Sequence, residues 1–144
     1  MSLLPKYTIE DVTERLGITA RTLHYYEEIG LLPVVSRTEG RHRIYDEANV
    51  ERIEHILRLK QVLGASLQEI RDILQAEEEL DHIRVQYYEE PHSEEERDQL
   101  LDDAAERLQS IMTHIDEKIA NLQTMRQGFS ARLERAKLLK QRTQ

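Results

Sequence analysis

The last third of the chain repeats apolar residues every seven positions, and this pattern constrains the fold more than any other feature. It consists of two series spaced by seven and offset by four: Leu101, Leu108, Ile115, Leu122, Phe129 and Ala136, then Ala105, Met112, Ile119 and Leu133. Residues 94–140 contain no Pro and a single Gly. An apolar heptad held over several repeats is typical of a coiled coil. The sequence therefore predicts a long C-terminal coiled-coil helix over residues 99–142.

Such a helix is too long to bury its apolar seam against a small domain of the same chain. About 40 or more residues rise roughly 60–70 Å at about 1.5 Å per residue. An amphipathic helix can pack on its own domain, but this length favours a partner helix, and a second copy is the simplest partner. Arg126 interrupts the seam beside Gly128, which indicates a local kink or a marker of register. The expected dimerisation residues are Leu101, Leu108, Met112, Ile115, Ile119, Leu122, Phe129 and Leu133.

The front of the chain carries the signals of two short helices joined by a tight turn. Thr8 and Asp11 form a T-x-x-D capping pattern, and Gly17 ends the first helix. Thr19 can cap a second helix. The inner face of that second helix holds the apolar residues Leu23, Tyr26 and Ile29. Two helices in this arrangement predict a helix-turn-helix.

A short basic hairpin is expected next. The turn residues 38–40 separate the apolar pair Val34 and Val35 from Ile44 and Tyr45, which is the pattern of two strands and a turn. Cations gather at the tip of this hairpin, together with one imidazole: Arg37, Arg41, His42 and Arg43. The hairpin would therefore form the basic wing of a winged helix-turn-helix.

Two further helices complete the front domain. Asp46 can cap a third helix that ends near Gly64, and Ser66 with Glu69 gives a capping box for a fourth. The predicted fold class is therefore mainly α. It comprises an N-terminal winged helix-turn-helix domain with a small β-hairpin wing over residues 7–75, an acidic and partly helical linker over residues 76–98, and the long C-terminal coiled-coil dimerisation helix.

The second helix is the expected DNA-reading element. A helix fits the major groove, where base edges present distinguishable donors and acceptors. With the apolar face turned inward, Arg21, His24 and Tyr25 remain on the outer side. Arg21 is the best base-reading candidate, because an Arg can bond a guanine edge bidentately. Tyr25 could donate to a phosphate, and His24 could contact either group.

The run TARTLHYYEEIGLLPVVSRTEGRHRIYDEANVERIEHILRLKQVLGASLQEIRDIL resembles the mercury-resistance-regulator (MerR) family of bacterial transcription factors. The resemblance lies in T-L-x-Y-Y-E, then G-L-L, a basic wing and R-x-Y, and it covers about residues 7–75. The stretch HIDEKIANLQTMRQGF is also similar to the family's dimerisation helix. Two departures stand out. His24 occupies the place of the family's usual Arg, and Gly40 sits one place earlier in the wing than is common.

The resemblance implies a homodimer with an antiparallel coiled coil that binds a pseudo-palindromic operator in double-stranded DNA. It implies bending and untwisting of the promoter so that RNA polymerase can engage both promoter elements, which is recognition through deformation as well as base contacts. The candidate DNA-binding residues, placed by geometry and by match to the family motifs, are Thr19, Arg21, His24, Tyr25, Arg37, Arg41, His42, Arg43, Tyr45 and Lys60.

Composition removes several classes of function. The chain has no Cys, so disulfides, thiolate metal sites and Cys-ligated iron–sulfur sensors are excluded. No apolar run is long enough to span a membrane and no signal peptide is evident, so the expected compartment is the cytoplasm. No Gly-rich phosphate loop or Ser-His-Asp set is present. We therefore expect no enzymatic activity, no cofactor and no metal.

The net charge of −8 is unusual for a chain that binds DNA, which is itself negatively charged. The distribution of the charge along the chain removes this objection. Most of the excess acid lies in residues 76–106, away from the front domain. The 76–98 segment favours a solvated linker, and a small-molecule effector or cation site built on its imidazoles and phenols stays open: His82, Tyr87, Tyr88 and His92. Two other functions also stay open, an architectural, excisionase-like DNA-binding protein without promoter control and a coiled-coil interaction protein that has lost DNA binding.

Overall fold

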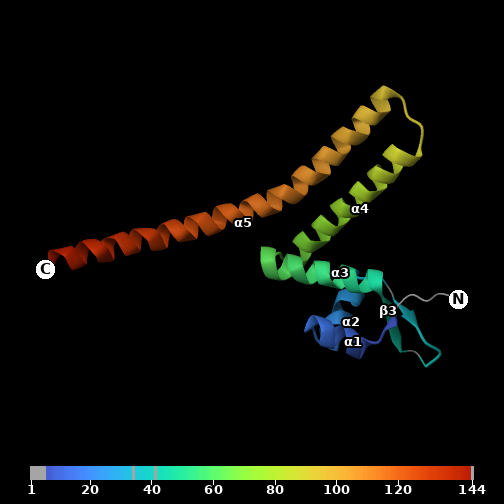
Figure 1. The fold of residues 1–144 in the computed structure, drawn as a ribbon, viewed down its shortest axis with the longest axis horizontal. Coiled ribbons are helices and arrows are strands. Elements are labelled where there is room, and N and C mark those ends of the chain that lie inside the picture. Colours follow the sequence, from blue (N-terminus) through green and yellow to red (C-terminus); the bar gives the residue numbers. More distant parts are fainter. Residues whose placement is uncertain (1–5, 34, 41, 144) are drawn as a thin grey trace. The chain divides into compact units, whose positions relative to one another are not determined.

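The computed structural model describes residues 6–33, 35–40 and 42–143, and it divides the chain into two compact units, residues 1–71 and 72–144. The predicted fold class, mainly helical with a small sheet and a long C-terminal helix, is confirmed (Figure 1). In chain order the elements are β1 (Lys6–Tyr7), α1 (Ile9–Leu16), α2 (Ala20–Glu28), β2 (Ser36–Arg37), β3 (Arg43–Asp46), α3 (Glu47–Arg58), the π-helical turn η1 (Leu59–Leu63), α4 (Leu67–Glu89) and α5 (Glu94–Arg142).

The predicted helix caps are confirmed. The Thr8 hydroxyl accepts from the amide of Asp11 at 3.2 Å, and the Asp11 carboxylate accepts from the amide of Thr8 at 2.9 Å. The same reciprocal pattern joins Ser66 and Glu69 before α4. Gly17 ends α1 with φ 66°, a left-handed conformation in which a side chain would be strained. Local sequence thus fixes where these helices begin and end.

The sheet of the first unit has three strands in the order β1-β3-β2. All pairs are antiparallel, with Tyr7 opposite Tyr45 and Ser36 opposite Ile44. β1 was absent from the sequence prediction, since two residues are too few to show an alternating pattern. Its Tyr7 hydroxyl donates to the Glu47 carboxylate at 2.7 Å, which raises the Tyr7 pKa and ties the strand to the start of α3.

The core of the first unit is built from the inner faces of all its helices. Its most deeply buried side chains are Val12, Leu23, Tyr26, Leu31, Tyr45, Val50, Ile53, Ile56 and Ile70. Burial of one such side chain stabilises a fold by roughly 1.5–3 kcal/mol. Leu23 and Tyr26 lie inward, as the sequence predicts, so the opposite face of α2 is turned outward.

The second unit consists of the later part of α4 and the whole of α5, joined at residues 90–93. The stretch expected to be an acidic, partly helical linker, residues 76–98, is helical over most of its length: residues 76–89 continue α4, and residues 94–98 begin α5. Its bounds as a linker stay a prediction. The break between the two helices falls at residues 90–93, where Pro91 cannot continue a helix.

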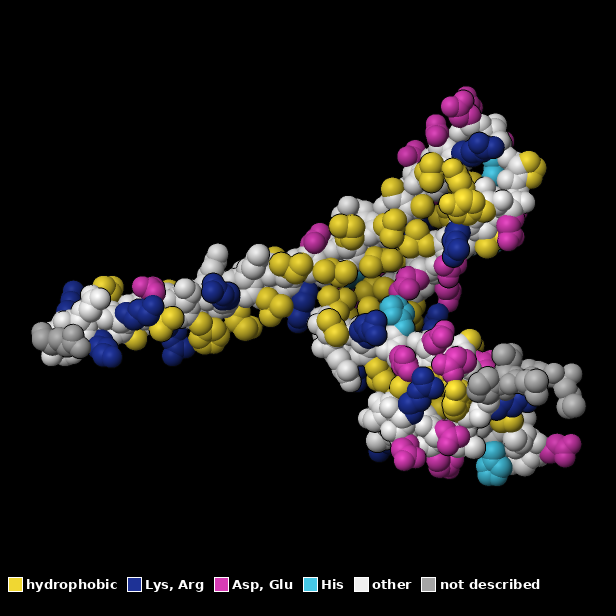
Figure 2. Space-filling view, viewed as in Figure 1, with side chains coloured by type: hydrophobic (Ala, Val, Ile, Leu, Met, Phe, Trp, Pro, Cys, Tyr) yellow, Lys and Arg dark blue, Asp and Glu magenta, His cyan; other side chains and the backbone are white. Residues whose placement is uncertain are grey.

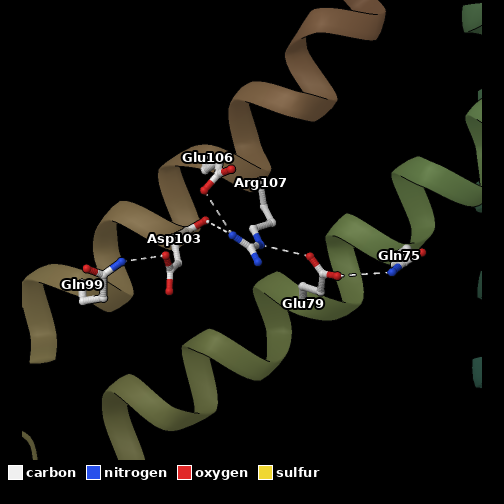
Figure 3. A network of polar contacts seen from close by, with 6 residues as sticks. All are labelled: Gln75, Glu79, Gln99, Asp103, Glu106 and Arg107. Atoms are coloured by element: carbon white, nitrogen blue, oxygen red, sulfur yellow. Dashed lines mark hydrogen bonds and ion pairs between the residues drawn. The ribbon is translucent and has the colours of Figure 1, made fainter.

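Polar contacts hold α4 and α5 together as a helical hairpin (Figure 3). The Arg107 guanidinium donates from Nε to the Glu79 carboxylate at 3.0 Å, and Gln75 donates to the same carboxylate at 3.3 Å. At the turn, both ring nitrogens of His92 lie near oxygen acceptors: Nε2 is 2.6 Å from the Gln86 carbonyl oxygen, and Nδ1 is 3.1 Å from the Glu96 carboxylate.

Beyond the hairpin, α5 has no cover within the part of the chain that the structure describes. The helix is 49 residues long, so it rises roughly 70 Å, and none of its residues is buried. The seam residues are 42–60% exposed, from Ile115 at the low end to Phe129 at the high end. The predicted long helix is confirmed, and its pairing stays a prediction. Within the described residues, no helix is both long and apolar enough to cross a membrane.

Candidate nucleic-acid interface

The outward face of α2 carries the side chains expected to read DNA. Thr19 caps the helix, its hydroxyl accepting from the Thr22 amide at 3.2 Å. Arg21, His24 and Tyr25 are exposed, Tyr25 at 46%. Within the described residues, the Arg21 side chain makes no hydrogen bond or ion pair, so its five donors face solvent. α2 thus presents a cation, an imidazole and a phenol on one surface.

The wing lies on β2 and β3 and adds further cations. Arg37 stands directly opposite Arg43 in the antiparallel register, so the two side chains share one face of the hairpin. The turn closes through the Thr38 amide, which donates to the His42 carbonyl at 2.9 Å, and through the His42 amide, which donates to the Thr38 hydroxyl at 3.2 Å. His42 is exposed at the tip. The predicted contact residue Arg41 lies outside the described residues.

One ion pair connects the wing to the recognition helix. Arg43 donates from Nε to the Glu27 carboxylate at 2.8 Å, and the two side chains are only 23% and 10% exposed. Its Nη1 lies 2.9 Å from His24 Nε2. Because a guanidinium only donates, Nε2 of His24 is the acceptor in this contact. Arg43 therefore positions the wing against α2 through residues of that helix, in addition to the phosphate contact expected from the sequence.

Two other predicted contact residues have different surroundings. Tyr45 is 1% exposed, and burial raises the pKa of its phenol. Its hydroxyl has no hydrogen-bond partner within the described residues. The expected DNA contact of Tyr45 therefore needs correction, because its side chain packs in the core from β3 and does not reach the surface. Lys60, in contrast, is exposed on the π-helical turn η1, so its ammonium group is accessible to a DNA phosphate.

Three supporting residues were missed by sequence reasoning. Glu27 orders the wing, as described above. Arg52 of α3 donates to the Leu31 carbonyl at 3.3 Å, and Arg71 of α4 donates to the Ile29 carbonyl. Both carbonyls lie in the turn that follows α2, so the two guanidinium groups fix the exit of the recognition helix. These contacts join residues 21 and 42 positions apart, and no local pattern reports such a pair.

The chemistry of this surface suits polyanion binding rather than catalysis. Arg21, Arg37 and Lys60 are exposed cations, and the inner wing cation is held in place by a carboxylate. Within the described residues, no group of three or more His, Asp or Glu side chains could hold a metal ion. An exposed recognition helix beside a basic hairpin defines a winged helix-turn-helix, a class of DNA-binding domain.

Comparison with known proteins identifies the family. Residues 7–77 match the family model described as MerR HTH family regulatory protein. The chain is 37% identical over 131 residues to the HTH-type transcriptional regulator YfmP of Bacillus subtilis, an alignment that covers 89% of this chain and 93% of YfmP. The protein belongs to the MerR family, and it is a DNA-binding transcriptional regulator.

Two other relatives are informative. The chain is 35% identical to nodulation protein NolA of Bradyrhizobium elkanii, covering 83% of this chain but 56% of NolA, so it spans about half the length of that relative. The crystal structure of a MerR-family transcriptional regulator from Bacillus thuringiensis has a TM-score of 0.50 and 24% identity, covering 88% of this chain and 99% of that one. The latter likeness concerns the fold alone.

Proposed function

We propose that the protein binds a pseudo-palindromic operator within a promoter as a homodimer and distorts that DNA. Two features of the described residues support this proposal: one recognition helix, α2, and an apolar seam on α5 whose large side chains are 42–60% exposed. A stable oligomer covers such a seam. A two-fold dimer presents two recognition helices to two half-sites, so the operator mirrors the symmetry of the protein.

The contacts divide into reading and positioning. Arg21 reads a base edge from the start of α2, because its guanidinium is unoccupied within the described residues and can bond a guanine bidentately. The remaining α2 contacts, from Thr19, His24 and Tyr25, fix the helix in the groove. Contacts to phosphates come from the wing and from η1: the exposed Arg37, His42 and Lys60, the half-buried Arg43, and Arg41, which lies outside the described residues. Such contacts position the protein and carry no sequence information directly.

Distortion of the DNA is the last part of the proposal, and the resemblance to the MerR family supports it. The Glu27–Arg43 pair ties each wing to its own recognition helix, so each half-site would meet one ordered winged helix-turn-helix domain, or head. The DNA then bends or untwists to meet both heads, with an energy that depends on the sequence between the half-sites. In a promoter, this change in twist would alter how RNA polymerase engages the two promoter elements.

Selection of DNA from a random pool tests the proposal, followed by titration of the selected site at two salt concentrations. We expect an inverted repeat, a stoichiometry of two chains per site and a steep fall of affinity with salt. A circular-permutation gel shift of the selected site should reveal a bend. Binding and bending without a recovered motif would instead indicate an architectural protein, and one chain per site would contradict the homodimer.

A further inference from the structure

His24 lies where the wing meets the recognition helix, and its side chain is exposed. The contact from the wing comes from Arg43 of β3, whose Nη1 lies 2.9 Å from Nε2 of the ring. A guanidinium can only donate, and a doubly protonated imidazole has no acceptor to offer. This hydrogen bond therefore forms only while the ring is neutral, and protonation of His24 would break it.

The charges near His24 decide which form of the ring the protein favours in the absence of DNA. Figure 2 shows cationic, acidic and imidazole side chains together on the first unit, so the balance has to be taken from the nearest neighbours. On α2, Arg21 lies one turn before the ring, and Glu27 and Glu28 lie one turn after it. Glu27 already pairs with Arg43 at 2.8 Å. Two cations thus face two carboxylates, and the close contact with Arg43 tips the balance toward the neutral ring.

A DNA phosphate on this surface would reverse the preference. Arg43 uses Nε for Glu27 and Nη1 for His24, so its other N–H groups remain for an anion. Arg37 stands opposite Arg43 in the hairpin and is exposed, which adds a second cation that attracts phosphate to this face. A phosphate oxygen that accepts from Arg43 here approaches Nε2 of His24, and two acceptors cannot bond each other. With a proton on Nε2, the ring becomes a charged donor to that oxygen.

Resting on the DNA contacts proposed above, we infer that His24 is a proton-linked DNA contact, a neutral acceptor for Arg43 in the unbound protein and a protonated donor to a phosphate in the complex. The proton comes from solvent and adds to Nε2, while Nη1 of Arg43 transfers its hydrogen bond from the ring to the phosphate. Each chain takes up as much as one proton when it binds DNA. Because the complex holds more protons than the separate molecules, affinity for DNA rises as the pH falls through the range near about 6.5 in which imidazoles titrate.

The opposite pH dependence would follow if His24 only held Arg43 in place. Protonation would then release the Arg43 guanidinium from the ring, and the affinity for DNA would fall as the pH falls. The direction of the pH dependence therefore distinguishes a proton-linked contact from a residue that acts only by positioning Arg43.

Titration of the full chain with duplex DNA at about pH 7.5 and about pH 6.0 tests the inference. The ionic strength is held constant, because salt screens phosphate contacts. Two duplexes are used, the selected operator and a duplex of mixed sequence, since phosphate contacts do not depend on sequence.

Three variants identify the ring that carries the effect. His24→Gln keeps an oxygen acceptor for Arg43 but cannot titrate, and His24→Arg carries a fixed charge. His42→Gln removes the imidazole that is exposed at the wing tip. Thermal melting of each variant establishes that the first unit is folded.

We expect the wild-type chain to bind either duplex roughly tenfold more tightly at the lower pH, and the affinity of both His24 variants to change by less than about twofold. The His42→Gln variant should keep the wild-type ratio. Calorimetry in buffers of different ionisation enthalpy should show proton uptake by the wild-type chain and none by His24→Gln.

The inference and the proposed function fail in different ways. A wild-type affinity that falls or stays constant on acidification, or a His24→Gln variant with the wild-type ratio, would overturn the proton-linked contact and leave DNA binding standing. If the wild-type chain bound neither duplex at either pH, DNA binding itself would be overturned, and the proton-linked contact with it.

Discussion

The two units of the molecule use their apolar residues differently. In the first unit, α1, α2 and α3 each bury at least one apolar side chain, and Leu23, Val50 and Ile53 are 0% exposed. In the second, α5 buries none of its 49 residues. The first unit has its own core, which a domain needs in order to fold alone. The apolar residues of the α5 seam are as regularly spaced, but none of them is buried by the described residues. They can therefore contribute to stability only when another helix packs on them.

Polar contacts show the same difference. In the first unit they join distant elements, as where Arg15 of α1 lies 3.6 Å from Glu47 and 3.5 Å from Glu54 of α3. In the outer half of α5, polar contacts between described residues stay within one or two turns of the helix, as between Lys137 and Glu134 at 3.4 Å. Directional contacts fix one arrangement of the head, whereas a single helix with local contacts can pair with another copy of itself.

The largest effect is expected from a charge placed in the α5 seam, which should weaken the dimer and leave the core of the first unit intact. In an Ile115→Asp variant, each dimer would bury two unpaired carboxylates, at a cost of several kcal/mol per ion. A loss of about 4 kcal/mol corresponds to roughly a thousandfold rise in the dimer Kd. Sedimentation equilibrium measures this Kd, and operator binding should fall in parallel. Thr124→Asp, on the opposite face of α5, is the matched control and should leave the Kd nearly unchanged.

This experiment distinguishes the core of the first unit from the seam of α5. If the Ile115→Asp variant kept the wild-type Kd, the seam would not be the interface. If the head of that variant lost its thermal transition, the first unit would not be independent of association.

Removal of the Arg21 guanidinium, which makes no hydrogen bond or ion pair with the described residues, should change DNA recognition without changing the core of the first unit. Arg21→Ala should lose about 1–3 kcal/mol for the preferred site and little for random DNA, since one bidentate base contact disappears. Competition binding with the selected operator and a scrambled duplex measures the ratio. An unchanged ratio would assign base reading to another residue.

Arg37 and Arg43 of the wing offer a sharper comparison, because they stand opposite each other and, among the described residues, Arg43 has a carboxylate partner and Arg37 has none. Arg43→Ala should destabilise the head by about 1–3 kcal/mol, since the partly buried carboxylate of Glu27 loses its partner. Arg37→Ala should leave the head's thermal stability unchanged. Both should reduce the salt dependence of operator binding by roughly one counterion. Equal melting temperatures of the two variants would contradict a positioning role for Arg43.

Sequence could predict what depends on neighbours along the chain. The cap at Thr8, the inward face of Leu23 and Tyr26 and the presence of a long C-terminal helix are set by residues within a turn or two, and all are confirmed. α5 begins at Glu94, five residues before the predicted start. The burial of Tyr45 and the Arg43–Glu27 pair depend on which strand meets which helix, so no local spacing reports them. The extent of helix in residues 76–98 could not be predicted from their acidity, because a helix can be solvated as well as a loop can.

The turn between α4 and α5 should respond to pH, and this is the smallest effect we expect. Acceptors face both ring nitrogens of His92, so only the doubly protonated ring donates to both, which raises its pKa above 6.5, chiefly through the Gln86 carbonyl and then through Glu96. The pKa of Glu96 is lowered in turn, so that carboxylate stays ionised near neutrality. A raised folded-state pKa adds stability that is fully present below about 6.5 and is lost as pH rises through the folded value.

The melting temperature of the second unit should therefore decrease as the pH is raised from about 6 to about 8.5. This decrease should be larger in the wild-type chain than in a His92→Gln variant. Glutamine keeps one donor but does not titrate, so the difference between the two curves isolates this ring from the other five imidazoles. Parallel curves would mean that His92 is equally protonated in the folded and unfolded chains.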